Sequence, residues 1–179
     1  MLSKNAFSRL GGDQRGVAAV EFALCAPLLI LFYFGVAELT EAIIAEHRAS
    51  HAASVVADLV AQESTTTSAE VTDIFNVGVA LLQPAPVDTL KMRVSAITAD
   101  STAKPKVVWS RGYGQSGRST GLISGFPANL LAANESVIMA EVSYSYVSPL
   151  KQVLKTPLAY SETFYLKPRR SPAVTCSSC

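Results

Sequence analysis

The stretch VAAVEFALCAPLLILFYFGVA, residues 17–37, decides how the chain is organised. Its only ionisable side chains are those of Glu21, Cys25 and Tyr33. A helix of this length spans about 30 Å, the thickness of a bilayer's hydrocarbon core. We therefore predict a transmembrane helix. A secretory signal peptide fits less well because its apolar region has only about 7–15 residues. A buried core helix seldom runs so far with so little charge.

The charges on either side of this stretch indicate its orientation. Three basic residues precede it, whereas Arg48 is the only Lys or Arg in the fifteen residues that follow. The three are Lys4, Arg9 and Arg15. Positive charges stay on the cytoplasmic side of a membrane, so the N-terminus is predicted to be cytoplasmic. We divide the chain into a basic leader (residues 1–16), a transmembrane helix (17–37) and an extracytoplasmic remainder.

Composition excludes several classes of protein. The chain has 179 residues, of which 49% are hydrophobic and 16% charged, and its net charge is +1. This length suits one domain and leaves little room for separate cofactor and substrate modules. High apolarity argues against a disordered chain, and balanced charge gives no general basic footprint for a nucleic acid.

Glu21 is the least expected residue of the apolar stretch. A carboxylate within a membrane helix costs up to roughly 3 kcal/mol at mid-bilayer and less near the surface. It therefore either pairs with a partner or extends to the cytoplasmic surface, about one turn away. The surrounding sequence bears on this choice, because Arg15 and Gly16 precede the stretch and Phe22 follows the glutamate.

The segment GVAAVEF, residues 16–22, resembles the prepilin processing motif of the tight-adherence (Flp) pilus system. In that motif a membrane peptidase cuts after a glycine that is followed by four residues, Glu, and Tyr or Phe. The resemblance implies cleavage between Gly16 and Val17. Phe22 stands where the major pilins of the system usually carry Tyr. Cleavage would create an α-amino group at Val17, with a pKa near 8, that Glu21 of a neighbouring subunit could meet in a staggered helix pair.

Beyond the span the pattern remains helical to about residue 62. Residues 38–62 form an amphipathic extension of the same helix, and we expect its apolar stripe to seat the domain. The apolar positions are Leu39, Ile43, Val55, Val56, Leu59 and Val60. Pro27 lies inside the span and is expected to kink or loosen the helix. Thr67 and Glu70 form a capping box that starts a second helix, which ends before Pro84.

After Pro86 the apolar period changes to two, which indicates strands. Four are predicted, at residues 90–98, 107–111, 137–147 and 160–167. Sequential strands with short connections favour an antiparallel sheet. The predicted fold is therefore α+β: a long N-terminal helix, a second helix and a four-stranded antiparallel sheet. The domain covers residues 63–170, and residues 171–179 form a tail that carries a cysteine pair.

This downstream part resembles the TadE/TadG-like family, the minor pilins or pseudopilins of the same pilus system. The similarity lies in LKMRVSAIT (90–98), VVWSRGYG (107–114), VIMAEVSYSYVSPL (137–150) and KPRR (167–170). It implies a pilin-like fold and a non-enzymatic assembly role without a cofactor. It also implies partners: other pseudopilins, the major Flp pilin, prepilin peptidase, the inner-membrane assembly platform and the lipid bilayer. The expected location is the inner membrane, single-pass, with a periplasmic domain, and also the pilus.

Two other patterns are weak indications of a ligand site. GYGQSG, residues 112–117, matches G-x-G-x-x-G, but the sequence after it is poor helix material, so we favour a flexible loop over a phosphate site. His47 and His51 lie one turn apart, yet no third ligand is recognisable, so no metal site is predicted.

Three cysteines are present. Cys25 lies in the span and is interpreted as a small apolar residue. Cys176 and Cys179 form C-x-x-C near the C-terminus, where an oxidising compartment permits a disulfide. A local structural disulfide is favoured over redox catalysis because no thioredoxin-like helix context is recognisable.

Two alternatives to an assembly subunit remain open at this stage. One is a membrane-anchored module that binds or senses a periplasmic ligand. The other is a periplasmic redox protein that uses Cys176 and Cys179. A mature chain that begins at Val17 would favour the pilin interpretation, and activity lost in a Cys176→Ser variant would favour the redox protein.

Overall fold

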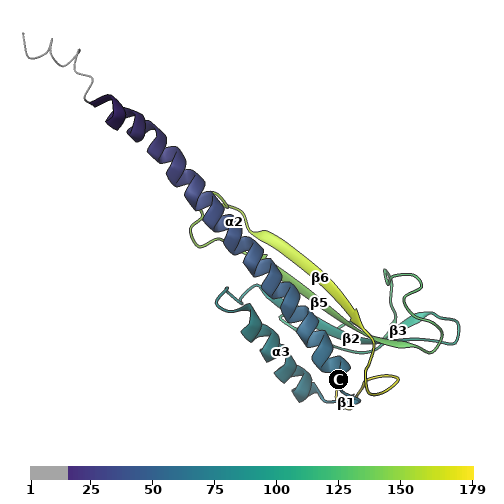
Figure 1. Cartoon of the computed structure of the whole chain (residues 1–179). Helices are drawn as coiled ribbons and strands as arrows, with labels where there is room; N and C mark the ends of the chain where they lie inside the picture. Colours follow the sequence, from purple (N-terminus) through teal and green to yellow (C-terminus); the bar gives the residue numbers. More distant parts are fainter. Residues whose placement is uncertain (1–15) are drawn as a thin grey trace, which may run out of the picture.

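The computed structural model describes residues 16–179. Its N-terminal helix α2 (Val17–Ala61) is continuous through Pro27. Figure 1 shows that the first half of α2 projects from the domain as a stem, while the second half lies along the sheet. The second helix, α3 (Ser68–Leu82), runs back beside α2. The basic residues Lys4, Arg9 and Arg15 of the predicted leader lie outside the described residues.

The sheet has five strands, so the prediction of an antiparallel sheet is confirmed with one strand added. Their order is β4-β3-β2-β5-β6, and every neighbouring pair is antiparallel. The strands are β2 (Lys91–Ala99), β3 (Pro105–Tyr113), β4 (Gly121–Leu122), β5 (Ser136–Tyr146) and β6 (Leu158–Leu166). The additional strand β4 has only two residues, too few for an alternating pattern to be recognised in the sequence.

A separate two-stranded pair lies at the end of the domain remote from the stem. Here β1 (Thr65–Thr66), just after α2, pairs in parallel with β7 (Thr175–Cys176) of the C-terminal tail. The tail therefore returns to the place where α2 ends (Figure 1).

An alanine-rich face of α2 seats the sheet, which corrects the expected apolar stripe. Leu39 is 53% exposed and Ile43 is 45% exposed, so neither belongs to the core. Val56 and Val60 of the predicted stripe are buried, and in place of Leu39 and Ile43 the same face buries Ala42, Ala45, Ala49 and Ala53. These residues recur every three or four positions and thus form one face of the helix. Their small side chains let the sheet approach the helix backbone closely.

Helix α3 begins at the expected capping box. The Glu70 amide donates to Thr67 Oγ1 at 3.3 Å, and the Thr67 amide donates to the Glu70 carboxylate at 2.8 Å. Its buried face includes Val71, Phe75 and Leu82, which join the core between α2 and the sheet.

Candidate assembly helix and its junction with the domain

The predicted processing point lies at the first residue of the described helix. Gly16 is the N-cap of α2, and Val17 is its first helical residue. Gly16 is exposed, and a Cβ placed on it would meet no atom of the described residues within 4 Å. The peptide bond between Gly16 and Val17 is therefore sterically open in the described part of the chain.

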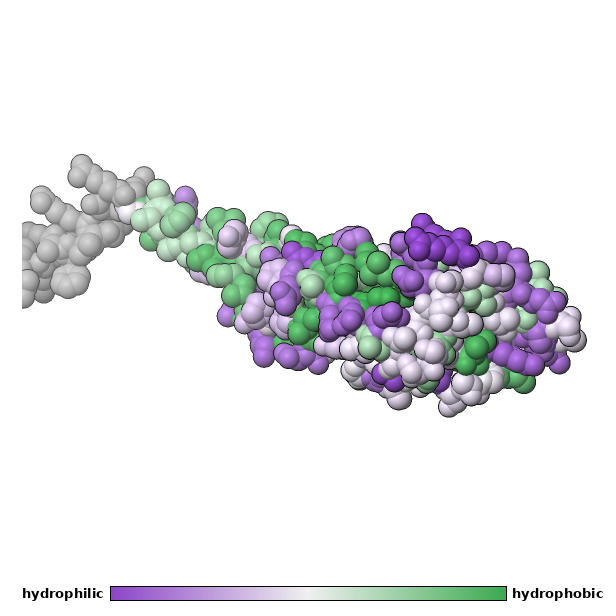
Figure 2. Space-filling model, turned by 90° about the horizontal axis from the view of Figure 1, so that it is seen from below, coloured by the Kyte–Doolittle hydropathy of each residue, from purple (hydrophilic) through white to green (hydrophobic). Residues whose placement is uncertain are grey.

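The stem presents an apolar surface on all sides. Phe22 is 69% exposed, and the other large apolar residues of residues 17–36 are also exposed, except Phe34, which is half-buried. Figure 2 shows this hydrophobic stem projecting from a domain with a mixed polar surface. Glu21 is exposed in the second turn and makes no hydrogen bond or ion pair within residues 16–179. Within this range, Val17–Gln62 is the one helix long and apolar enough to cross a membrane.

Glu38 marks the point where the stem enters the domain. It directly follows the predicted span and is only 1% exposed. Its Oε1 accepts the Gln152 amide at 2.7 Å, and its Oε2 accepts the amides of Val153 at 3.1 Å and Leu154 at 2.6 Å. One helix carboxylate thus holds three consecutive amides of the loop between β5 and β6.

The hydrogen bonds determine the charge state of this carboxylate. Burial by itself raises the pKa of Glu38, because it removes water from the ionised form. The three backbone amides, with the Ser148 hydroxyl, stabilise the ionised form and outweigh burial, so the pKa of Glu38 lies below its ordinary value. Glu38 is therefore a charged clamp between helix and loop at neutral pH.

A second contact lies one turn further along the helix. The Tyr160 hydroxyl of β6 donates to the Ala42 carbonyl at 3.3 Å. Burial raises the pKa of Tyr160, with Glu46 and Tyr146 adding to the effect, so the phenol remains a donor at neutral pH. Loop and strand thus both hold the helix close to the end of the span.

Comparison with known proteins concerns this same helix. Residues 16–58 match the family model described as TadE-like protein. The N-terminal helix is TadE-like. The match agrees with the family suspected from the sequence and suggests a protein associated with the tight-adherence pilus, but it covers the helix and none of the four downstream segments quoted for that resemblance. Comparison with curated proteins and with solved structures finds no significant match.

The TadE-like segment contains part of the predicted site and leaves the cysteine pair outside. It includes Gly16, Val17, Glu21 and Phe22, which the first two turns of α2 place together at the free end of the stem. Cys176 and Cys179 lie at the opposite end of the molecule (Figure 1). The structure therefore does not unite all predicted residues in one site.

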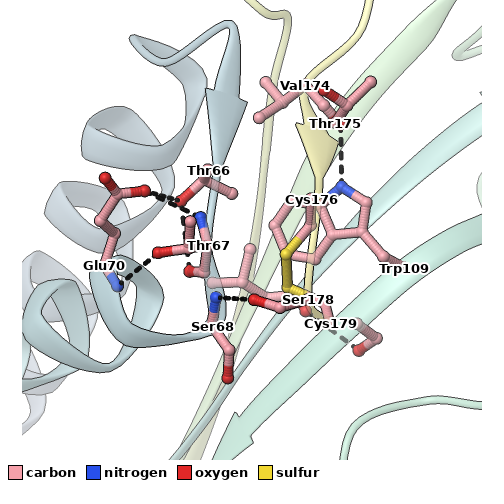
Figure 3. The surroundings of a disulfide bond; sticks show 12 residues. Thr66, Thr67, Ser68, Glu70, Trp109, Val174, Thr175, Cys176, Ser178 and Cys179 are labelled. Carbon is pink, nitrogen blue, oxygen red and sulfur yellow. Dashed lines mark hydrogen bonds between the residues drawn. A yellow bond between two sulfur atoms is a disulfide. The ribbon is translucent and has the colours of Figure 1, made fainter.

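A disulfide joins Cys176 and Cys179 in the tail (Figure 3). Around it, the Trp109 indole donates to the Val174 carbonyl at 2.8 Å, and the Ser68 amide at the start of α3 donates to the Ser178 hydroxyl at 3.0 Å. This arrangement fastens the tail to the sheet and to α3.

The remaining sequence signals have structural explanations. Gly112 lies in β3, and a side chain on it would collide with the Gln115 carbonyl of the turn that follows. This glycine serves a tight turn, and the next element is β4 rather than a phosphate-binding helix. His47 and His51 are exposed on α2. Among the described residues no group of three or more His, Cys, Asp or Glu could hold a metal.

Ion pairs on the outer face of the sheet were not predicted from the sequence. The Glu141 carboxylate accepts Arg93 Nε at 2.7 Å and Arg118 Nη2 at 2.6 Å. Burial raises the pKa of Glu141, but the two guanidinium groups lower it more, so it lies below its ordinary value. Arg118 thereby fastens the glycine-rich loop over the sheet.

Proposed function

We propose that the chain is a minor pilin or pseudopilin needed for assembly of a tight-adherence (Flp-type) pilus. The observation that carries the proposal is the TadE-like match over residues 16–58, which coincides with an exposed apolar stem attached to a folded domain. The role is structural and not catalytic.

In this proposal prepilin peptidase cleaves the chain between Gly16 and Val17. The motif at residues 16–22 and the open surroundings of Gly16 support this step. Before cleavage the chain spans the inner membrane once, with the leader in the cytoplasm and the domain in the periplasm. Excess basic residues before the span and their scarcity after it support this orientation.

Cleavage prepares the helix for side-by-side packing. The new ammonium group at Val17 and the carboxylate of Glu21 lie four residues, or about 6 Å, apart along the helix. When two helices pack with a one-turn stagger, Glu21 of one subunit meets the ammonium of the next. This pairing offsets the free-energy cost of a carboxylate in lipid and sets the register between subunits.

The packing surface continues beyond the membrane. Leu39 and Ile43 are apolar, exposed and outside the span, so they extend the stem's apolar surface along the domain. This surface would contact other pseudopilins and the major Flp pilin, while the inner-membrane platform extracts the helix from the bilayer. Phe22 follows Glu21 at the N-terminal end of the same surface.

The mature N-terminus tests the processing step. Intact-mass analysis of the protein from cells that contain the peptidase should show a chain that begins at Val17. A Gly16→Val variant, which alters the residue before the cut and leaves the span intact, should retain Met1. A wild-type chain that keeps its leader in these cells contradicts the proposal.

Assembly is tested with two matched glutamate variants. Glu21→Gln removes the proposed register charge, whereas Glu41→Gln removes an exposed charge from the same helix beyond the span. Both proteins should insert in the membrane, and only Glu21→Gln should abolish co-assembly, measured as sheared pili and as subunit cross-links. Normal assembly of Glu21→Gln would show that register is set elsewhere.

A further inference from the structure

The loop that joins β5 to β6, residues 147–157, lies beside the end of the predicted span. Figure 1 shows it next to α2 at the point where the stem leaves the domain. Val153 Cγ2 lies 3.5 Å from the position that a Cβ on Gly35 would occupy. Since Gly35 belongs to the predicted span, this loop reaches the level of the bilayer surface.

The backbone amides of this exposed loop are hydrogen-bonded within the chain. Five consecutive amides, residues 151–155, all donate to acceptors of the chain itself. Lys151 donates to Ser148 Oγ, the next three donate to the Glu38 carboxylate, and Lys155 donates to the Val153 carbonyl. A backbone that needs no water for these donors can enter the membrane interface at low free-energy cost.

The side chains of the loop combine apolar groups with cations. Leu150 is 47% exposed and Val153 is 46% exposed, so both present apolar surface outwards. Lys151 and Lys155 alternate with them and are also exposed. Apolar side chains that enter lipid, flanked by lysines at headgroup level, are a pattern that favours an anionic membrane surface.

An apolar groove joins this loop to the stem. On the helix side it is lined by Leu28, Leu31 and Phe32, and on the loop side by Val153, Leu154 and Lys155. The helix side belongs to the predicted span, so the groove is continuous with the lipid-facing surface.

We propose that the loop at residues 147–157 is a second membrane contact that binds an anionic phospholipid of the bilayer. An acyl chain occupies the groove between stem and loop, and the phosphate pairs with Lys155 and Lys151. The contact rests on the membrane anchoring in the proposed function, and it holds the domain close to the lipid surface before assembly.

Nitroxide labels on the full-length chain test the depth of the loop. In a Cys25→Ser background, single cysteines are placed at Val153, at Leu29 of the span, and at Ser101 in the β2–β3 turn at the remote end of the domain. The proteins are reconstituted in vesicles of phosphatidylcholine and phosphatidylglycerol, and accessibility to oxygen and to a water-soluble nickel complex is measured. We expect oxygen to be favoured at Leu29 and Val153, and nickel at Ser101.

The outcomes separate this contact from the anchor itself. If the Leu29 label is exposed to lipid but the Val153 label is as accessible to nickel as the label at Ser101, the loop contact is overturned and the anchor is not. A Leu29 label that is accessible to nickel would overturn both the membrane anchor and the loop contact. A Val153 label shielded from both reagents would show that protein rather than lipid covers the groove, which also overturns the proposal.

Charge variants test the lipid chemistry. With Lys151→Glu and Lys155→Glu together, the oxygen-to-nickel ratio at Val153 should fall by at least about fivefold in vesicles that contain phosphatidylglycerol. The matched pair Lys104→Glu and Arg170→Glu makes the same charge change on exposed residues and should leave the ratio unchanged. Lys104 lies in the β2–β3 turn, and Arg170 follows Arg169, which contacts the far end of α2 at Ala61. Equal ratios in the loop variant and the wild type, or in vesicles with and without phosphatidylglycerol, would overturn recognition of an anionic lipid.

Discussion

At the scale of single residues, Glu38 shows how one carboxylate can join two parts of a chain. Its position immediately after the apolar stretch is visible in the sequence, but nothing distinguishes it there from Glu41, which is exposed. The distinguishing partners are amides 114–116 residues further along. Because any residue except proline supplies an amide, such a clamp leaves no pattern in the sequence.

The clamp should depend on pH in a defined direction. The pKa of Glu38 is lower in the folded protein than its ordinary value of 4.5, so its stabilising contribution is fully present above that value. The contribution is lost as the pH falls below about 4.5 and through the folded pKa. Hydrogen exchange of the Gln152, Val153 and Leu154 amides, corrected for intrinsic rates, should therefore show protection that declines in this acid range.

Two comparisons isolate the charge of Glu38. In Glu38→Gln the same three amides should exchange roughly tenfold faster at neutral pH, because bonds to an ionised acceptor are stronger than bonds to an amide oxygen. Amides in the ladder between β2 and β5, which have no titratable partner, should remain protected over the same pH range. Uniform loss of protection across the domain would indicate global unfolding and contradict a local clamp.

At the scale of elements, periodicity predicts where helices and strands lie better than it predicts which face is buried. The capping box at Thr67 and Glu70, and the four longer strands, are confirmed to within a few residues. The face of α2 that seats the sheet was predicted only in part: Val56 and Val60 are buried as expected, whereas Leu39 and Ile43 are exposed. These two residues weigh more in a hydropathy pattern than the buried alanines do. Alanine fits at these positions because the sheet lies close to the helix, and this closeness is a result of tertiary packing that the sequence pattern does not show.

Short elements escape sequence prediction for another reason. Strand β4 exists because Gly121 and Leu122 pair with Val107 and Lys106 across the folded-back loop. Strands β1 and β7 pair over a separation of more than a hundred residues along the chain. A strand of two residues is too short to show a periodic pattern in the sequence. It becomes a strand only because it pairs with its partner. The motif at residues 16–22, in contrast, is local, so the sequence alone is enough to predict a processing site there.

Gly78 of α3 provides a prediction about the contact between the two helices and the sheet. A Cβ at this position would lie 2.8 Å from Met92 Sδ and 2.9 Å from Val56 Cγ2. Alanine favours a helix by about 1 kcal/mol over glycine, but overpacking in a closed core costs about 1–3 kcal/mol. Gly78→Ala should therefore lower the free energy of unfolding by about 1 kcal/mol, measured by denaturant titration in detergent. Asn76→Ala, on the exposed face of α3, should be neutral or slightly stabilising, and the same result for Gly78→Ala would contradict close packing here.

At the scale of the whole molecule, the domain is attached to α2 at both ends of the helix's outer half. Glu38 and Tyr160 hold the end next to the stem. At the far end the Arg169 amide donates to the Ala61 carbonyl at 2.8 Å, Arg169 pairs with Asp58, and the tail pairs with β1. Because the domain is attached at two ends, helix and domain form one rigid unit, and in the proposed assembly role a movement of the stem would be transmitted to the domain.

The disulfide between Cys176 and Cys179 should strengthen only the far end of this unit. It closes a ring of about four residues, so the entropy model limits its contribution to about 2 kcal/mol. In the double variant Cys176→Ser and Cys179→Ser, the Thr175 and Ser177 amides that bridge β7 to residues 64–66 should exchange faster. The β2–β5 ladder and the Glu38 clamp should remain protected, because their hydrogen bonds lie elsewhere. Pilus assembly should persist in this variant; its loss with a folded domain would mean that the cysteine pair has a chemical role beyond fastening the tail.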